Sequence, residues 1–310
     1  MENKEKNFIS AVVYVRNDEK NIGVFLEMLL VYLESRFEHY EIVCVDDDST
    51  DGSIDEIRRI SKQHADATIS IIGLSYFQGT EAAMNAGVDI SIGDFVLEFD
   101  KTSLDFDADL IHQVYRKSLE GNDIVYAVPS GKNAWTSKIF YALYNAFTPK
   151  HVRLFTSSFN IISRRGINRV KSITDKSIYR KALYAQCGLP QTSVSYLPKT
   201  GDEHKKETGM RINLAVDSLA VFTTIAYRFS LFLSLLMVLF SLMTVIYTVV
   251  VYLGTNKPVE GWTPIMLFLS ISFFFVFGLF AVIIKYFEIL TKNAFNKRSY
   301  VISGIEKLGR

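Results

Sequence analysis

The stretch EIVCVDDDSTDG, residues 41–52, decides the fold of this 310-residue chain. A run of apolar and β-branched residues leads straight into three aspartates and a polar turn. Such a run, bounded by turn residues, predicts a buried strand. Because ligands bind at the carboxyl ends of strands in open parallel sheets, Asp46 and Asp47 stand where a binding site is expected. The alternative interpretation is that the aspartates only form the turn and cap the next helix.

On both sides of this stretch, strand and helix patterns alternate over the first 128 residues. Apolar runs predict strands at residues 8–15, 41–45, 67–72, 95–99 and 124–128. Helical spacing of apolar residues predicts helices at 21–37, 53–64, 80–91 and 109–120. This alternation predicts an α/β fold with a mostly parallel sheet. Beyond residue 128 the patterns weaken, and we predict only a helix at 135–147 and a strand at 159–162.

Two long uncharged segments, residues 229–253 and 262–284, give the chain its positive mean hydropathy of +0.16. Each exceeds the roughly 20 apolar residues that cross a hydrocarbon core, so a transmembrane hairpin is predicted. The segments exclude a plain cytosolic protein. Residues 1–227 contain no comparable run, which excludes a multi-pass transporter.

The short connection between the two segments predicts that both flanks of the hairpin lie on one side of the membrane. Basic residues cluster in these flanks, and the positive-inside rule makes that side cytoplasmic. The expected organisation is a cytoplasmic domain at 1–209, an amphipathic juxtamembrane helix at 210–227, two transmembrane helices at 228–285 and a cytoplasmic basic tail at 286–310.

The net charge of +1 hides an uneven distribution. Residues 1–128 carry 11 Lys and Arg against 25 Asp and Glu, whereas residues 129–211 carry 15 against 4. An acidic half could hold a cation and a basic half could face phosphates; the alternative is two solvated faces of one domain. No P-loop and no GxGxxG pattern occurs, which argues against a P-loop kinase and a dinucleotide oxidoreductase.

Two predicted strands end in carboxylates: Asp46 and Asp47 follow one, and Asp100 follows the strand at 95–99. Such carboxylates can accept hydrogen bonds from a base or a ribose, or ligate a divalent cation. The basic residues Lys205, Lys206 and Arg211 stand just before the first uncharged segment, where they could hold an anionic lipid phosphate.

Several strings occur in a family's order: EIVCVDDDSTDGS, GTEAAMNAGVDISIGDFVLEFD, RLFTSSFNIISRR and, before the membrane, RINLAVDSLAVF. Together with the two spans they resemble glycosyltransferase family 2, and within it the polyprenyl-phosphate glycosyltransferases. The resemblance implies a GT-A fold, a nucleotide-sugar donor and a polyprenyl-phosphate acceptor at the bacterial inner membrane. It further implies Mg²⁺ or Mn²⁺ and a homo-oligomer, a tetramer among the options; no nucleic-acid partner is expected.

The resemblance also assigns residues to roles. Asp18, Asp46, Asp47 and Asp100 would bind the nucleotide sugar. Asp100 would also be the metal ligand and, with Asp105, a catalytic residue. A basic pair after the middle strand, Arg164 and Arg165, would join the basic residues before the membrane at the lipid phosphate.

The chain departs from the family at the metal motif, where Asp-x-Asp appears as Asp100-Lys101-Thr102. Two hypotheses therefore stand. The first is an enzyme that uses a nucleotide sugar, with a UDP-sugar favoured, and needs no strong base because a lipid phosphate is already ionised at pH 7. The second is a catalytically impaired relative that binds a nucleotide sugar, a lipid phosphate or a partner enzyme.

Overall fold

The computed structural model describes residues 4–130, 155, 157, 159–173, 179–199, 261–295 and 300–309, with scattered positions between 232 and 246. The chain divides into two compact units. One consists of Met1–Asn145, Pro149–Arg211 and Arg298–Arg310, and the other of Ala146–Thr148 and Ile212–Lys297.

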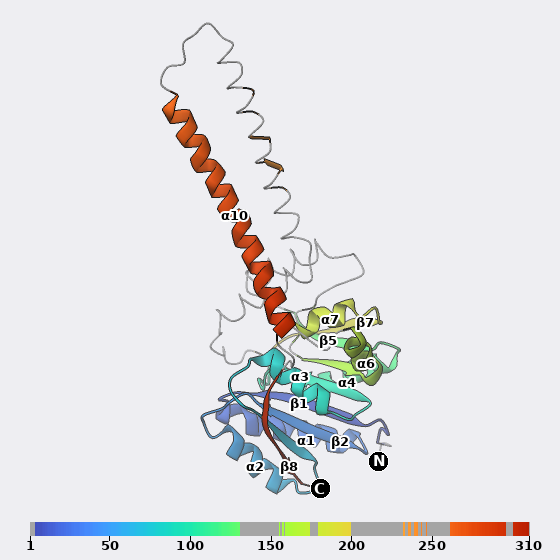
Figure 1. The fold of residues 1–310 in the computed structure, drawn as a ribbon. Helices are drawn as coiled ribbons and strands as arrows, with labels where there is room; N and C mark the ends of the chain where they lie inside the picture. Colours follow the sequence, from blue (N-terminus) through green and yellow to red (C-terminus); the bar gives the residue numbers. More distant parts are fainter. Residues whose placement is uncertain are drawn as a thin grey trace. The chain divides into compact units, whose positions relative to one another are not determined.

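The first unit is built on an eight-stranded sheet with the order β7-β5-β6-β4-β1-β2-β3-β8 (Figure 1). Its strands are β1 (Ile9–Val15), β2 (Tyr40–Asp46), β3 (Ile69–Leu74), β4 (Phe95–Phe99), β5 (Ile124–Pro129), β6 (Phe159–Ser163), β7 (Gln191–Tyr196) and β8 (Ile302–Leu308). Strands β4, β1, β2 and β3 run parallel to one another, as do β5 and β7. Strand β6 is antiparallel to β4 and β5, and β8 is antiparallel to β3. The mostly parallel α/β sheet of the prediction is confirmed.

Helices cover both faces of this sheet. They are α1 (Glu19–Arg36), α2 (Ser53–Gln63), α3 (Thr80–Ile90), α4 (Ala108–Leu119), α6 (Arg164–Ile173) and α7 (Arg180–Gln186). Side chains of β1 alternate between two cores: Val13 packs with α1, α2 and α4, whereas Val12 packs with α3, α6 and α7. This period of two is what the apolar run of β1 requires when both faces are buried.

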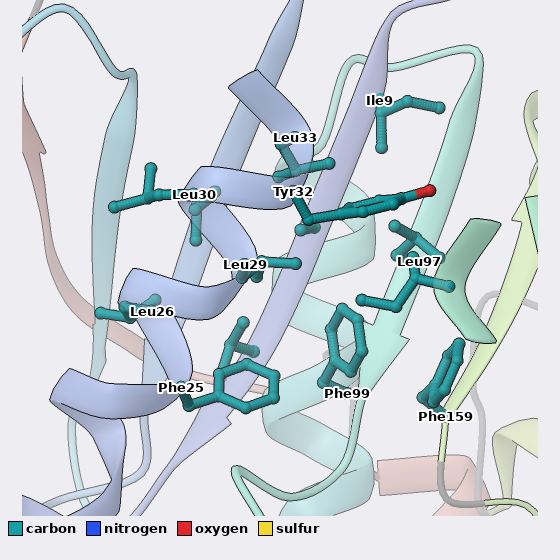
Figure 2. Close-up of a cluster of buried hydrophobic side chains, with 14 of the residues drawn as sticks. Ile9, Phe25, Leu26, Leu29, Leu30, Tyr32, Leu33, Leu97, Phe99 and Phe159 are labelled. Atoms are coloured by element: carbon teal, nitrogen blue, oxygen red, sulfur yellow. The ribbon is translucent and has the colours of Figure 1, made fainter. Parts of the chain in front are cut away.

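Figure 2 shows the larger core, in which α1 lies against the sheet. Phe25 and Leu29 of α1 are fully buried there. The ring of Phe25 meets that of Phe99 edge to face at 5.2 Å, and Phe159 lies 5.1 Å from Phe99. Phe99 is the last residue of β4, so this packing fixes the point at which the chain leaves the sheet for Asp100.

The prediction of a basic tail at 286–310 is wrong in one part. Residues Ile302–Leu308 form β8, which pairs with β3 and completes an edge of the sheet. The guanidinium of Arg58 in α2 grips Glu306 through two hydrogen bonds of 3.1 and 2.8 Å. The domain is therefore not confined to residues 1–209, because its last strand comes from the other end of the chain.

Helix α10 (Trp262–Phe295) belongs to the second unit and contains the uncharged residues 262–284. Among the helices of the described residues, none has both the length and the apolar character needed to cross a bilayer. The predicted helices at 135–147 and 210–227, and most of the predicted span 229–253, lie outside the described residues. The transmembrane hairpin stays a prediction.

Candidate active site

The predicted strand-end carboxylates lie at the same end of the sheet, where the parallel strands finish. Strand β1 pairs with β2 and β4, with Val15 opposite Asp46 and Val13 opposite Phe99. Asp46 is the last residue of β2, and Asp100 directly follows β4. The parallel topology thus brings together the two carboxylates that stand about fifty residues apart in the sequence.

Asp47 is turned into the protein and holds a neighbouring loop. It is fully buried, and its carboxylate accepts hydrogen bonds from the backbone N–H groups of Gln78 and Gly79, at 2.7 and 2.9 Å. The hydroxyl of Tyr14 donates to the same carboxylate at 3.0 Å. Asp47 therefore fixes the approach to α3, a structural role that the sequence did not assign to it.

Asp46 is only half-buried and accepts one backbone hydrogen bond, from Ser49 at 3.2 Å. Burial raises the pKa of its carboxyl, against the lowering effect of the hydrogen bonds from Ser49. Asp48 next to it has φ +62°, in the left-handed region that favours glycine. Asp48 is exposed, so Asp46 and Asp48, rather than the buried Asp47, are the aspartates that can face a ligand.

Asp18 lies in the loop after β1, which is bound to the loop after β2. Its backbone N–H donates to the hydroxyl of Ser53 at 2.7 Å, and its carboxylate accepts from Asn21 at 2.6 Å. Asp51 binds the first residues of α1 and α2, since its oxygens accept the backbone N–H groups of Glu19 and Ser53. The turn-and-cap interpretation therefore holds for Asp51, while Asp18 is placed at the same edge as Asp46.

Asp100 is bound by two cations that the sequence did not reveal as site residues. The Nη2 of Arg180 donates to one oxygen at 2.5 Å, and the Nζ of Lys181 lies 2.7 Å from the other. Arg180 is 1% exposed and also reaches Glu98, at 2.8 Å. Burial by itself raises the pKa of Asp100, but Lys181 and Arg180 outweigh it and hold the pKa at about 2. Asp100 is thus firmly ionised.

Glu98 is the fully buried centre of this cluster. Besides Arg180, the hydroxyl of Tyr184 donates to it at 2.5 Å and the amide of Asn160 at 3.0 Å. Glu81 of α3 closes the cluster from the side, because its carboxylate accepts the backbone N–H of Arg180 at 2.8 Å. Burial raises the pKa of Glu81.

Five buried polar atoms without a hydrogen bond belong to residues near this end of the sheet, and others lie elsewhere in the described residues. The five are Thr102 Oγ1, Asp105 Oδ1, Ser157 Oγ, Asn160 Oδ1 and Arg180 Nη1. Thr102 and Asp105 follow β4, and Ser157 and Asn160 lie at the start of β6, beside the end of β4. The second oxygen of Asp105 accepts the hydroxyl of Tyr196 at 3.1 Å. Because buried polar groups are normally paired, these five atoms leave hydrogen-bonding positions that water or a bound polar ligand can fill.

The donor atoms at Asp100 do not fit a divalent cation. Both of its oxygens are engaged by Arg180 and Lys181, and Thr102 stands where the second carboxylate of the motif would be. No three Asp, Glu, His or Cys side chains gather closely enough to hold a metal ion anywhere in the part of the chain that the structure describes. The prediction of Asp100 as a metal ligand therefore gains no support from the geometry.

Arg164 and Arg165 lie at the other end of the strands from the carboxylates. They follow Ser163, which pairs with Phe95 at the start of β4. The guanidinium of Arg164 donates to the carbonyl oxygens of residues 91 and 93, and Arg165 pairs with Asp123. The structure thus separates this pair from the predicted donor site and gives it structural partners. The other three predicted lipid-phosphate residues, Lys205, Lys206 and Arg211, lie outside the described residues.

An α/β sheet with carboxylates at the ends of its parallel strands, and β6 inserted antiparallel between β4 and β5, defines a GT-A-like glycosyltransferase domain. The family model "Glycosyl transferase family 2" matches residues 10–173, and the chain belongs to that family. The matched region contains Asp18, Asp46, Asp100 and Asp105, but not Arg180 or Lys181.

Similar proteins include an uncharacterized glycosyltransferase of Synechocystis sp., 27% identical over 266 residues that cover 83% of each chain. A bactoprenol glucosyl transferase of Shigella phage SfV is 25% identical, over 83% of this chain and 86% of the other. Mannosyl-3-phosphoglycerate synthase from Rubrobacter xylanophilus aligns in structure with a TM-score of 0.50 and 18% identity, over 69% of this chain and 73% of that one. This last likeness supports the fold.

Proposed function

We propose that this glycosyltransferase moves a sugar from a nucleotide sugar, with a UDP-sugar as the first choice, to a polyprenyl phosphate. The observation that carries the proposal is the set of five buried polar atoms without a hydrogen bond near Asp100, where a bound donor would supply the missing hydrogen bonds. The similarity to a bactoprenol glucosyl transferase supports a lipid phosphate as the acceptor.

The reaction does not require a general base from the protein. A phosphate oxygen of the acceptor forms a bond to the anomeric carbon while the bond from that carbon to the diphosphate breaks, and the electron pair leaves with the diphosphate. No proton has to be removed, because the acceptor phosphate is already ionised at pH 7. The protein has to orient the two substrates and stabilise the charge of the leaving group. Asp46 and Asp18 would hold the nucleoside, and Asp105, oriented by Tyr196, would hold a sugar hydroxyl.

The acceptor would be reached at the cytoplasmic leaflet of the bacterial inner membrane. The uncharged segments 229–253 and 262–284 support a membrane hairpin. The basic residues Lys205, Lys206 and Arg211, which stand just before it, would attract the lipid phosphate. Assembly into a homo-oligomer stays a prediction.

The test is transfer by the purified full-length chain in lipid nanodiscs. Radiolabelled UDP-glucose, UDP-N-acetylglucosamine and GDP-mannose are each incubated with undecaprenyl phosphate, and the label in the lipid fraction is measured. We expect transfer from at least one UDP-sugar, and its loss in Asp105→Asn. The matched control is Asp55→Asn, an exposed aspartate of α2 whose replacement should leave transfer unchanged. Binding of a donor without any transfer would contradict the proposal.

The second candidate is a non-catalytic subunit that binds a nucleotide sugar or a lipid phosphate. The observation in its favour is the engagement of Asp100 by Arg180 and Lys181, together with the threonine at position 102. This candidate predicts saturable donor binding in calorimetry with no labelled lipid under any condition.

A further inference from the structure

Two basic side chains take up both oxygens of Asp100, at the place where the family resemblance puts a metal ion. Lys181 is 8% exposed, and its ammonium also lies 3.4 Å from the carbonyl oxygen of Ser157. Arg180 is 1% exposed, and its Nη1 forms an ion pair of 3.6 Å with a carboxylate oxygen of Glu81 but no hydrogen bond among the described residues. This nitrogen therefore keeps an N–H position that a phosphate oxygen could accept.

The carboxylates of the cluster are already paired with two cations. Glu98 and Asp100 contribute two negative charges, and Arg180 and Lys181 contribute two positive charges. Burial raises the pKa of Glu81, the remaining acid, while the nearby Arg180 and Lys181 act to lower it. A divalent cation added to this cluster would face two fixed cations a few ångströms away, and like charges at that distance repel strongly in a buried site. The two cations therefore disfavour a divalent metal ion at Asp100.

We propose that Lys181 and Arg180 replace the divalent cation: they hold the donor diphosphate at Asp100 and neutralise the charge it gains on leaving. The inference rests on the proposed function, and it states which side chains neutralise the charge of the departing diphosphate. When the bond to the anomeric carbon breaks, the diphosphate gains one negative charge. The fixed cations meet that charge, and no proton or metal ion has to move. Ammonium and guanidinium groups bind phosphate oxygens by charge-assisted hydrogen bonds.

Lys181 is the better of the two residues to test. Removing Arg180 would leave Glu98 and Asp100 without their shared buried partner, and the domain would lose stability. Lys181 pairs with Asp100, and Asp100 would keep Arg180 as a partner without it. Lys181→Arg retains the charge and serves as the conservative variant. Lys117→Gln, on the exposed surface of α4, is the matched lysine control.

The experiment measures binding of UDP and GDP to the full-length chain in nanodiscs by calorimetry, once in EDTA and once in MnCl₂. For the wild type we expect the affinity for the preferred nucleotide to change less than about tenfold between the two conditions. Lys181→Gln should lose about tenfold or more in affinity, whereas Lys181→Arg should stay within about threefold and Lys117→Gln should match the wild type. The melting temperature of each variant shows whether it folds.

A second variant distinguishes a lysine that binds the diphosphate from one with a structural role alone. Lys181→Gln combined with Thr102→Asp restores a pair of carboxylates and removes one cation, so it should bind Mn²⁺, detected by electron paramagnetic resonance, and regain nucleotide affinity in MnCl₂. Nucleotide binding by the wild type only in MnCl₂ would overturn this inference and leave the proposed function standing. Wild-type affinity in Lys181→Gln would overturn it as well. If neither nucleotide binds in either condition, the proposed function falls with it.

Discussion

The Nζ of Lys181 in α7 lies 2.7 Å from an oxygen of Asp100, although Asp100 directly follows β4 and stands 81 positions earlier in the chain. The contact joins the start of α7 to the end of β4. It places a fixed positive charge at the edge of the sheet where Asp46 also ends its strand. Several properties of the domain depend on this ion pair and on the loops around it.

The first prediction concerns acid stability. The pKa of Asp100 is about 2 in the folded protein, below the value of about 3.9 for an unfolded aspartate. A lowered pKa stabilises the fold above the unfolded value and loses that effect as the pH falls toward the folded value. We therefore expect the wild type to lose about 2 kcal/mol from this group between about pH 5 and pH 2. Urea unfolding at a series of pH values measures the loss.

The same series run on Asp55→Asn provides the control, because that aspartate is exposed and should leave the acid slope unchanged. In Lys181→Gln the remaining partner of Asp100 is Arg180, so the acid transition should move to higher pH. An acid transition identical to that of the wild type would show that the ion pair contributes nothing to stability.

The second prediction separates Asp47 from Asp46. Asp47→Ala leaves the N–H groups of Gln78 and Gly79 and the hydroxyl of Tyr14 without their acceptor. Hydrogen bonds to a charged group are worth about 1.5–3 kcal/mol each, and we expect a loss of about 3 kcal/mol in unfolding free energy. Asp46→Ala should cost about 1 kcal/mol or less in stability and weaken nucleotide binding about tenfold. Equal melting temperatures for the two variants would refute this assignment.

The third prediction concerns Asp48, whose backbone is in the left-handed region. At φ +62° a side chain with a β-carbon is strained, and more so when it is β-branched. We expect Asp48→Gly to fold at least as stably as the wild type, and Asp48→Val to lose about 1–2 kcal/mol. Thermal melting of the two variants side by side checks the order; a more stable valine variant would contradict it.

The fourth prediction concerns the side of the membrane. Asn256→Cys, in the connection between the two uncharged segments, should react in intact cells with a maleimide that cannot cross the membrane. Lys205→Cys should react only after the cells are opened. The natural Cys44 and Cys187 are buried, so they should contribute little background. The reverse pattern of labelling would sink the proposed topology and, with it, access to a cytoplasmic donor.

The sequence predicted the first five strands and four helices within about two residues, because their apolar patterns have the periods of two and 3.6 that these elements impose. It missed α7, where Arg180 and Lys181 are charged residues inside the protein rather than on its surface. Their signal was present in YRKALY, where two charges stand among apolar residues, but their partners Glu98 and Asp100 lie far away in the chain. It also missed β8, since Glu306 and Lys307 give that edge strand the composition of a tail.

Asp47 shows the same limit within the site. Three consecutive aspartates predict a binding site, and the parallel sheet does carry them to the expected edge. Which of them faces outward depends on the loop at residues 75–79, whose N–H groups capture the second carboxylate. That loop lies some thirty residues further along the chain, and no local sequence pattern predicts these hydrogen bonds.

Strand β8 has a consequence for the making of the protein. Its partner β3 is synthesised early, but 105 residues separate the end of β7 from the start of β8. At about 5–20 residues per second, the ribosome needs roughly 5–20 s to supply them. During that interval the open edge of β3 offers unpaired N–H and C=O groups to any other strand nearby. The sheet of the nascent domain is completed only when β8 has been synthesised. Until then, the ribosome-bound chain is open to incorrect strand pairing at β3.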